Sequence, residues 1–318
     1  MKILVVFTGG TIGSSVKNGI ADIDGNPAKK LLELYPDIDF VCIEPFSILS
    51  ENSTVDTLEH LCNFMLGVDY DNYNGVILTH GSDTLGYTAA ALGIALSYVR
   101  IPVMLTAADY VLSDERSNGT ENFCGCVDFI GEFVKGKHEY SGVYAVWKNR
   151  GDFVRVHHAR CLEQADFNDE FHSYRKGSFG TMSHGSFVKD KAAYGGVKLS
   201  LFSEDLQGKL IRLSRNVLLL KSYVGADFDC ISLDGKDAVL VQAYHSGTVC
   251  TEGENTSFVK FAKRCKEQGV DVFLYSVKDR SYIYRSAKKI PWGAVTPVFD
   301  TGECSAYVGL LFRYGKIE

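Results

Sequence analysis

Short apolar runs alternate with longer segments of helical spacing through the first part of the chain. The runs are rich in Val, Ile and Leu, which is typical of strands that are buried in a parallel sheet and joined by crossover helices. Apolar residues at helical spacing between the runs predict helices over residues 84–98 and about 120–134. The runs themselves predict strands at residues 2–7, 39–44, 75–79, 102–106 and 142–147.

A stretch rich in Gly, Ser and Lys, from about residue 177 to 213, interrupts this pattern. Such a composition is typical of a domain junction, and it has room for a hairpin. We therefore expect a larger N-terminal α/β domain over residues 1–190, a linker over 191–213 and a smaller C-terminal α/β domain over 214–318. The last of these is predicted to contain strands at 216–221, 238–244 and 271–276 and helices near 255–268 and 303–314.

Composition and charge narrow the class of protein. The 318 residues, 46% hydrophobic and 23% charged, suffice for two globular domains and exclude disordered and fibrous classes. A formal net charge of -6 gives no electrostatic reason to expect a nucleic-acid partner. No apolar run approaches the roughly 18 residues of a membrane span, and the run after Met1-Lys2 is too short for a signal-peptide core. We therefore expect a cytoplasmic protein without a membrane partner.

The cysteines and histidines give no sign of a metal site. The nine cysteines contain no C-x-x-C pair and are odd in number, so we expect reduced thiols. Cys124 and Cys126 lie two residues apart in a predicted helix and therefore point to different sides. His157, His158 and His172 lack the matching cysteine or carboxylate spacing of a zinc site, so we expect solvated or hydrogen-bonded histidines. No metal and no cofactor are predicted.

Two of the apolar runs open into glycine-containing turns that carry hydroxyl groups. Residues 3–7 lead into Thr8-Gly-Gly-Thr-Ile-Gly13, and residues 76–78 lead into Thr79-His-Gly-Ser-Asp-Thr84. Because ligands of an open parallel sheet bind at the carboxyl ends of its strands, both turns can face one pocket. The glycines at positions 9, 10, 13 and 81 allow positive φ and a close approach to a small ligand. The candidate reactive groups are Thr11, Ser82 and Asp83.

Each turn also has a purely structural interpretation. The first turn could serve packing or phosphate binding, but neither G-x-G-x-x-G nor a P-loop lysine is present. Ser82 and Asp83 could cap the N-terminus of the following helix. Capping is compatible with a role in a site, and it does not account for the preceding His80-Gly81. We therefore favour a shared functional site at the two strand ends.

Together, Thr8-Gly-Gly-Thr-Ile-Gly13 and Thr79-His-Gly-Ser-Asp-Thr-Leu85 resemble the two signature segments of the bacterial-type L-asparaginases, the asparaginase/glutaminase family. Leu112-Ser-Asp-Glu-Arg-Ser-Asn118 and Tyr244-His-Ser-Gly247 extend the resemblance over nearly all of the chain. The resemblance implies a larger, catalytic, flavodoxin-like N-terminal domain and a smaller C-terminal one. It also implies a homodimer or homotetramer in which a partner's C-terminal domain completes each site. The Ser-Asp turn looks more like the cytoplasmic branch of the family.

The resemblance implies that a side-chain amide is hydrolysed through an acyl-enzyme on a threonine hydroxyl. Thr11 matches the usual nucleophile, and Ser82 stands where the family usually has a second threonine. Asp83 matches the aspartate that binds the substrate's α-ammonium group. Ser50 and Glu51 resemble contacts to the α-carboxylate and α-amino groups, although a polar loop explains them equally well. The backbone expected to line the pocket belongs to small residues, namely Gly10, Gly81, Ala107 and Ala108.

The position of the catalytic base departs from the family pattern. The resemblance places a lysine a few residues before Ala165-Asp-Phe-Asn-Asp-Glu-Phe171, where counting back reaches Leu162. The nearest basic residue is Arg160, and a guanidinium cannot act as a neutral base. Arg160 could pair with Asp83, but we favour a surface salt bridge.

The lid turn and the second domain also leave alternatives open. The family places a tyrosine on the lid soon after the nucleophile, whereas this chain has Ile20 there and its next tyrosine is Tyr35. Either another group activates Thr11 or activity is low. Glu303 could be the carboxylate that the second domain lends to the site, but we favour a first-turn carboxylate that stabilises a helix N-terminus.

Three functions remain open at this point. The first is an amidohydrolase that acts on L-asparagine, with L-glutamine ranked second. The second is the asparaginase-like subunit of a tRNA-dependent amidotransferase, which we rank low because such a subunit normally carries an extra module before the first motif. The third is an asparaginase-like protein that has an altered amide substrate, or low activity and a role in binding an amino acid. The small-molecule partner that we expect is an amino-acid amide.

Overall fold

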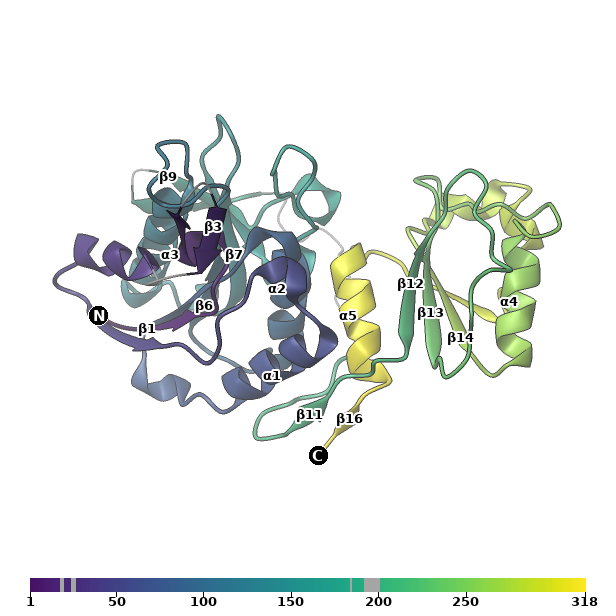
Figure 1. Ribbon diagram of the computed structural model, residues 1–318, viewed down its shortest axis with the longest axis horizontal. Helices are drawn as coiled ribbons and strands as arrows, with labels where there is room; N and C mark the ends of the chain where they lie inside the picture. Colours follow the sequence, from purple (N-terminus) through teal and green to yellow (C-terminus); the bar gives the residue numbers. More distant parts are fainter. Residues whose placement is uncertain (18–19, 24–26, 184, 192–200) are drawn as a thin grey trace. The chain divides into compact units, whose positions relative to one another are not determined.

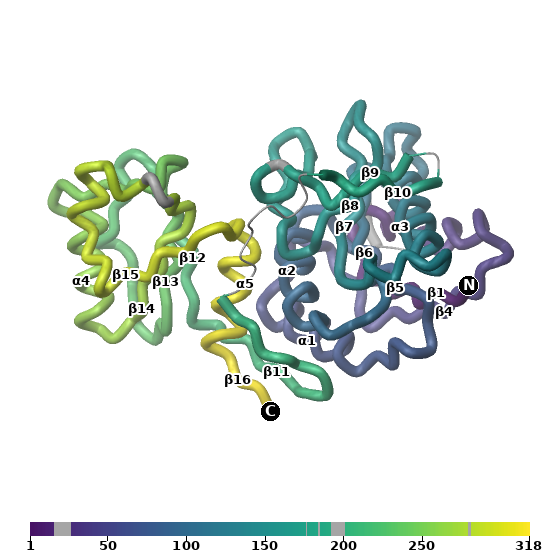
Figure 2. Tube along the Cα trace, turned by 180° about the vertical axis from the view of Figure 1, so that it is seen from behind, coloured from purple at the N-terminus to yellow at the C-terminus, as the bar shows by residue number. Residues whose placement is uncertain are grey.

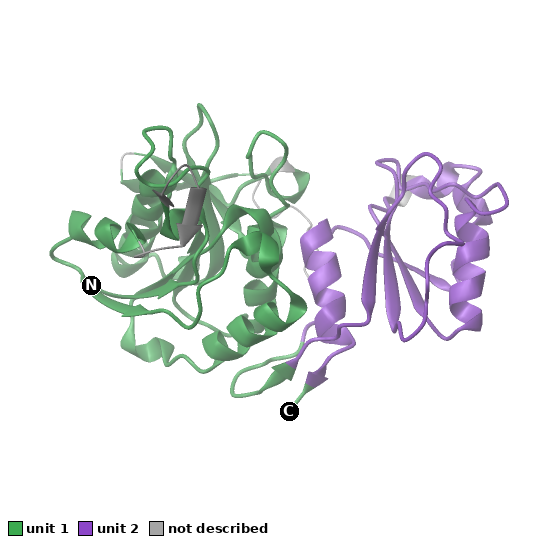
Figure 3. Ribbon diagram, in the orientation of Figure 1, with its two compact units in different colours: residues 1–195, 204–211, 317–318 green, residues 196–203, 212–316 purple. Residues whose placement is uncertain are grey.

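The computed structural model describes residues 1–17, 20–23, 27–183, 185–191 and 201–318 (Figure 1). The chain divides into two compact units (Figure 3). Unit 1 comprises residues 1–195, 204–211 and 317–318, and unit 2 comprises residues 196–203 and 212–316.

Unit 1 is built on an eight-stranded sheet with the order β10-β9-β8-β7-β6-β5-β1-β4. Its parallel part matches the five predicted strands: β1 (Lys2–Phe7), β4 (Asp39–Ile43), β5 (Gly75–Thr79), β6 (Pro102–Thr106) and β7 (Gly142–Lys148). Three antiparallel strands extend it: β8 (Val154–His158), β9 (Gly180–Ser183) and β10 (Ser186–Lys189). The last two form the hairpin for which the junction stretch has room, and the sequence pattern did not predict β8.

Three α-helices cover this sheet, α1 (Val55–Leu66), α2 (Leu85–Ala95) and α3 (Gly119–Val134). Figures 1 and 2 show α3 on one face and α1 with α2 on the other. Alternate strand residues such as Val5, Ile77 and Met104 form one core cluster together with Phe123 and Ile130 of α3. This period of two follows from strand geometry, which sends successive side chains to opposite faces. The predicted helix over 84–98 is confirmed but ends earlier, at Ala95.

Unit 2 has a four-stranded parallel sheet with the order β12-β13-β14-β15. The strands are β12 (Val217–Lys221), β13 (Ala238–Gln242), β14 (Asp271–Tyr275) and β15 (Val295–Pro297), and the helices are α4 (Phe258–Glu267) and α5 (Glu303–Arg313). Val239, Val241 and Leu274 pack with Phe258 and Phe261 of α4 in a separate core. The predicted strands and helices of this region are therefore confirmed, and this unit has its own hydrophobic core.

The remaining strands form two short pairs. These are β2 (Ser14–Lys17) with β3 (Ile20–Ile23), and β11 (Ile211–Arg212) with β16 (Lys316–Ile317). The structure has all nine cysteines as free thiols. Of the helices that the structure describes, none is both long and apolar enough to cross a membrane.

Candidate active site

The first glycine turn holds Thr11 at the carboxyl end of β1. Thr8 ties the turn to the neighbouring strand, because its Oγ1 donates a hydrogen bond of 2.8 Å to the carbonyl of Thr79. Gly9 and Gly10 have φ values of 94° and 75°, a left-handed conformation that favours glycine. A short 3-10 helix, Thr11–Gly13, follows them. Thr11 is partly exposed.

The second turn, after β5, is anchored by a buried histidine. The backbone N–H of His80 donates to the Thr106 carbonyl at 2.8 Å, and its Nδ1 lies 2.8 Å from the Gly81 carbonyl oxygen. The other ring nitrogen lies 3.1 Å from Thr88 Oγ1. Burial lowers the pKa of His80, which keeps the imidazole neutral near pH 7. His80 therefore holds the turn in place, which explains a residue that helix capping left unexplained.

The two turns and the segment around Ser50 meet with no room for a side chain between them. A Cβ atom on Gly10 would lie 2.3 Å from the Gly81 backbone nitrogen, and one on Gly81 would lie 2.2 Å from Ser50 Oγ. Gly81 has a φ of -89°, which any residue can adopt. A glycine is needed at this position because the neighbouring segments approach it so closely. Gly10 is linked to the third segment as well, since its N–H donates to the Ile48 carbonyl at 3.0 Å. Three distant segments thus form one site.

Ser50 and Asp83 come together within this site. Ser50 is buried and begins a 3-10 helix, Ser50–Asn52, and its Oγ donates to Asp83 Oδ2 at 3.3 Å. The hydroxyl of Thr84 donates to the Ser50 carbonyl at 3.1 Å, which fixes the segment further. Asp83 and Glu51 are exposed and Ser82 is partly exposed. An exposed carboxylate on a fixed hydroxyl can bind a cationic ligand group through a charge-assisted hydrogen bond.

The alternative interpretation, in which Ser82 and Asp83 cap the following helix, does not match the structure. Helix α2 begins at Leu85, and no side chain of its own turn caps it. Instead, the side chain of Gln164 accepts a hydrogen bond from the Gly86 N–H at 3.1 Å and donates one to the Asp83 carbonyl oxygen. Gln164 therefore supplies the cap from a distant segment, which leaves the Asp83 carboxylate to Ser50. Sequence reasoning missed Gln164, because nothing in its local pattern indicates this contact.

Ala107 and Ala108 follow β6, and both are fully buried. Asn122 of α3 holds this strand end: its Nδ2 donates to the Ala107 carbonyl at 3.0 Å, and its Oδ1 accepts from the Lys148 N–H at 2.8 Å. Asn118 acts in the same way, because its Oδ1 accepts from the Asp109 N–H at 3.1 Å. The two asparagines position the backbone after β6, a role that sequence reasoning did not find for Asn122.

The structure also gives the surroundings of the residues considered for the catalytic lysine and the lid tyrosine. Leu162 is buried. The aliphatic part of Arg160 packs on Gly93 of α2, ten residues along the chain from Asp83. Tyr35 is half-buried beside Cys124 of α3, and burial together with that thiol raises its pKa. The lid turn that contains Ile20 includes residues 18–19, which lie outside the described residues.

Glu303 is the first residue of α5, as the interpretation as a first-turn carboxylate requires. Its Oε2 accepts from the Tyr275 hydroxyl at 2.6 Å and lies 3.2 Å from Lys221 Nζ.

In the part of the chain that the structure describes, one group of side chains has metal-ligand spacing, namely Asp166, Glu170 and His172, whose ligand atoms lie within 4.8 Å of one another. Asp166 and His172 are exposed, and exposed acidic groups are common without a metal.

Comparison with known proteins gives a consistent result. Residues 2–193 match the family model "Asparaginase, N-terminal". The chain is 31% identical over 156 residues to the L-asparaginase of Dirofilaria immitis, an alignment that covers 39% of this chain and 26% of that protein. It is 28% identical over 156 residues to L-asparaginase 1 of Escherichia coli K12, covering 47% of this chain and 44% of that protein. The matched region thus spans less than half of these relatives.

A relative of another kind matches over nearly the whole chain. A glutamyl-tRNA(Gln) amidotransferase subunit of Metallosphaera sedula is 23% identical over 338 residues, which cover 99% of this chain and 72% of that protein. Among solved structures, the thermostable L-asparaginase of Thermococcus kodakarensis has a TM-score of 0.74 at 18% identity, covering 98% of this chain and 92% of that one. The probable cytoplasmic L-asparaginase of Campylobacter jejuni has a TM-score of 0.70 at 18% identity, with coverage of 98% and 94%. Both structures support the predicted two-domain fold.

Proposed function

Because this chain belongs to the asparaginase family, we propose that it is an amidohydrolase that converts L-asparagine to L-aspartate and ammonia. The observation that carries the proposal is the convergence of three segments at one edge of the sheet. Gly10 approaches Gly81, and Ser50 donates to Asp83, so that a nucleophile and an anchor for an amino acid belong to one site.

We assign the roles as follows. Thr11 Oγ attacks the amide carbon of the substrate, the C–N bond breaks, and ammonia leaves with the proton that the hydroxyl gives up. Water then hydrolyses the resulting ester and returns the proton to Thr11. Asp83 binds the α-ammonium group, Ser50 and Glu51 contact the α-groups, and Ser82 supplies a second hydroxyl. The backbone of Gly10, Gly81, Ala107 and Ala108 lines the pocket.

This chain differs from the family pattern at the position of the base that would accept the proton of Thr11. Leu162 is apolar and buried at the position where counting along the sequence expects a lysine. General base catalysis typically contributes about 10²–10⁴-fold to a rate. We therefore expect slow turnover, because no lysine stands at that position to take the proton.

The test is ammonia release from L-asparagine, L-glutamine, their D-isomers and N-substituted forms. The expected result is turnover of L-asparagine that Thr11→Ala abolishes. The matched control is Thr256→Ala, because the Thr256 hydroxyl donates to the Glu252 carbonyl in unit 2 and is expected to contribute only about 1 kcal/mol of stability. Turnover that persists in Thr11→Ala would disprove the nucleophile assignment, and an inactive panel would disprove the hydrolase.

Two other functions are each supported by one observation. The apolar Leu162 supports an asparaginase-like protein that acts on another amide, or that mainly binds an amino acid. Calorimetry would then give tight aspartate binding without measurable hydrolysis. The alignment with an amidotransferase subunit over 99% of this chain supports a role as such a subunit. Co-purification with a second subunit from the source cell is the measurement that decides for or against it.

We also propose that the protein is cytoplasmic and forms a homodimer or homotetramer. The similarity to a solved structure titled as a probable cytoplasmic asparaginase supports the location. The oligomer rests on the family pattern, in which a partner completes the site. Light scattering coupled to size-exclusion chromatography tests it, since a monomer at micromolar concentration would contradict it.

A further inference from the structure

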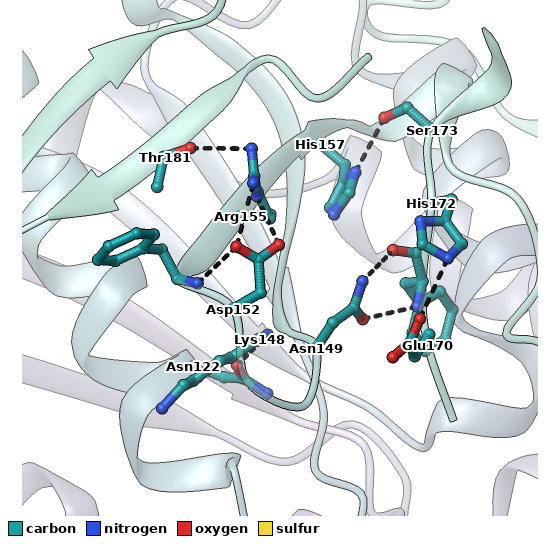
Figure 4. Close-up of polar contacts among 12 residues, drawn as sticks. Asn122, Lys148, Asn149, Asp152, Arg155, His157, Glu170, His172, Ser173 and Thr181 are labelled. Atoms are coloured by element: carbon teal, nitrogen blue, oxygen red, sulfur yellow. Dashed lines mark hydrogen bonds and ion pairs between the residues drawn. The ribbon is translucent and has the colours of Figure 1, made fainter. Parts of the chain in front are cut away.

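The candidate active site carries two exposed carboxylates, Asp83 and Glu51, that no cation balances among the described residues. The Asp83 carboxylate accepts the hydrogen bond from Ser50, and neither Asp83 nor Glu51 forms an ion pair with another described residue. Other carboxylates of unit 1 are paired, such as Asp152, which binds Arg155 through hydrogen bonds of 2.9 Å and 3.0 Å (Figure 4). The ligand side of Asp83 is therefore a negatively charged environment.

Glu51 and Asp83 act on the same ligand because Ser50 links their segments. Glu51 follows Ser50 in the 3-10 helix Ser50–Asn52, and Ser50 Oγ lies 3.3 Å from Asp83 Oδ2. Since consecutive Cα atoms are about 3.8 Å apart, the Cα of Glu51 lies within about 10 Å of the Asp83 carboxylate. That distance is close to the Debye length of about 10 Å at about 0.1 M ionic strength. Both negative charges therefore act on a ligand that Asp83 holds.

The hydroxyl of Ser50 does not offset these charges. Ser50 is only 2% exposed, and its hydroxyl hydrogen is donated to Asp83. A serine hydroxyl has a single hydrogen to donate, so it has none left for a ligand carboxylate. A ligand carboxylate beside the anchor would thus meet two negative charges without a hydrogen bond from this hydroxyl.

Free L-asparagine is a zwitterion whose α-carboxylate and α-ammonium groups are bonded to the same carbon atom. Asp83 balances the ammonium charge, which leaves Glu51 to repel the α-carboxylate. An amide bond at the α-carboxyl group removes this repulsion and keeps the ammonium group. We propose that the substrate is an asparagine with a free α-amino group and an uncharged α-carboxyl group, such as the amino-terminal asparagine of a peptide. This inference rests on the proposed function, from which it takes Asp83 as the anchor, and it narrows the substrate class of that site.

The test compares L-asparagine with its α-N-methylamide, which can release ammonia only from the side chain because its α-amide would release methylamine. At about pH 6.5 the α-amino group, with an ordinary pKa of about 7.7–8.0, is protonated. We expect kcat/KM for the N-methylamide to exceed that for L-asparagine at least about tenfold. One like charge at about 10 Å and an effective dielectric constant of about 20 has an effect of this size. A tenfold ratio corresponds to about 1.4 kcal/mol.

Glu51→Gln tests the role of charge, since it removes one negative charge and keeps the shape of the side chain. It is expected to raise kcat/KM for L-asparagine and to reduce the preference for the N-methylamide about tenfold. The matched control is Glu139→Gln. Glu139 is also an exposed glutamate of a 3-10 helix, His138–Tyr140, but this helix precedes β7 and so lies at the opposite ends of the parallel strands. The control is expected to leave the preference unchanged, whereas an unchanged preference in Glu51→Gln would overturn the inference.

Binding to the Thr11→Ala protein separates this inference from the proposed function. Calorimetry with both compounds is expected to give binding of the N-methylamide that is at least about tenfold tighter. Equal or tighter binding of L-asparagine would overturn the substrate class, even where the wild type releases ammonia from L-asparagine. Absence of ammonia release from both compounds would instead overturn the proposed hydrolysis, and the binding comparison would still decide the class of ligand.

Discussion

Replacement of Gly10 by alanine is expected to force apart the two turns that form the candidate active site. The new Cβ would lie 2.3 Å from the Gly81 nitrogen, 2.4 Å from its Cα and 2.6 Å from the carbonyl carbon of His80. All three are backbone atoms, so no side-chain rotation can relieve the contact. Gly10 also has a φ of 75°, which disfavours any residue with a Cβ.

The geometry sets the size of the effect. Ordinary Cβ contacts begin at 3.4 Å, so the turns have to separate by about 1 Å. A misplacement of about 1 Å at a reacting centre can cost about 100-fold in rate. The left-handed conformation costs about 1–2 kcal/mol and overpacking about 1–3 kcal/mol. We therefore expect kcat/KM for L-asparagine to fall about 100-fold and the free energy of unfolding to fall by about 2–5 kcal/mol.

The assay combines ammonia release with urea denaturation, and Gly151→Ala is the matched control. Gly151 has a nearly equal φ of 73° but no atom within 4 Å of its added Cβ. This control carries only the conformational cost of about 1–2 kcal/mol and is expected to keep full activity. If Gly10→Ala resembles Gly151→Ala in both activity and stability, the close approach of the two turns is not required, and the reasoning is refuted.

Three further predictions use other contacts. Asn122→Ala removes two hydrogen bonds of a fully buried side chain and is expected to cost about 2–6 kcal/mol in urea denaturation, against less than about 1 kcal/mol for the exposed Glu121→Ala. Gln164→Ala is expected to raise KM for L-asparagine more than it lowers kcat, because Asp83 loses its backbone partner; an unchanged KM in steady-state kinetics would contradict this. The folded-state pKa of His157 is lowered to about 3, so only the unfolded chain takes up its proton between pH 7 and 5. Stability therefore falls by about 2 kcal/mol more in the wild type than in His157→Gln over that range, as urea denaturation at both pH values measures.

The local sequence pattern predicted most of the strands and helices, but it missed strand β8. Runs such as residues 2–7 are buried on both faces, and that burial requires a continuous apolar sequence. Strand β8, by contrast, is Val-Arg-Val-His-His and carries polar residues that pair or line a cavity. Its pairing with β7 and β9 satisfies the backbone, but its alternation of two valines with polar residues is too short to have predicted a strand.

The roles of the candidate site residues stay predictions, and they rest on a local signal. The glycine turns identified Thr11, Ser82 and Asp83, because glycine and hydroxyl residues after a buried strand are a local signal. The sequence left the capping of α2 open, since a Ser-Asp pair before a helix looks the same whether its carboxylate caps the helix or binds Ser50. The deciding partner of that turn, Gln164, lies 81 residues from Asp83.

The sequence by itself determined the α/β class, most of the strands and the two strand ends where the chemistry is expected. Hydrophobic period, glycine positions and hydroxyl residues are properties of short segments, so they can be read locally. Only the tertiary structure decided which groups meet, such as Ser50 with Asp83, 33 residues apart, and the ring of His157 with Ser173, 16 residues apart. Such contacts depend on how the strands order in the sheet and how closely their turns pack, and no local pattern contains that information.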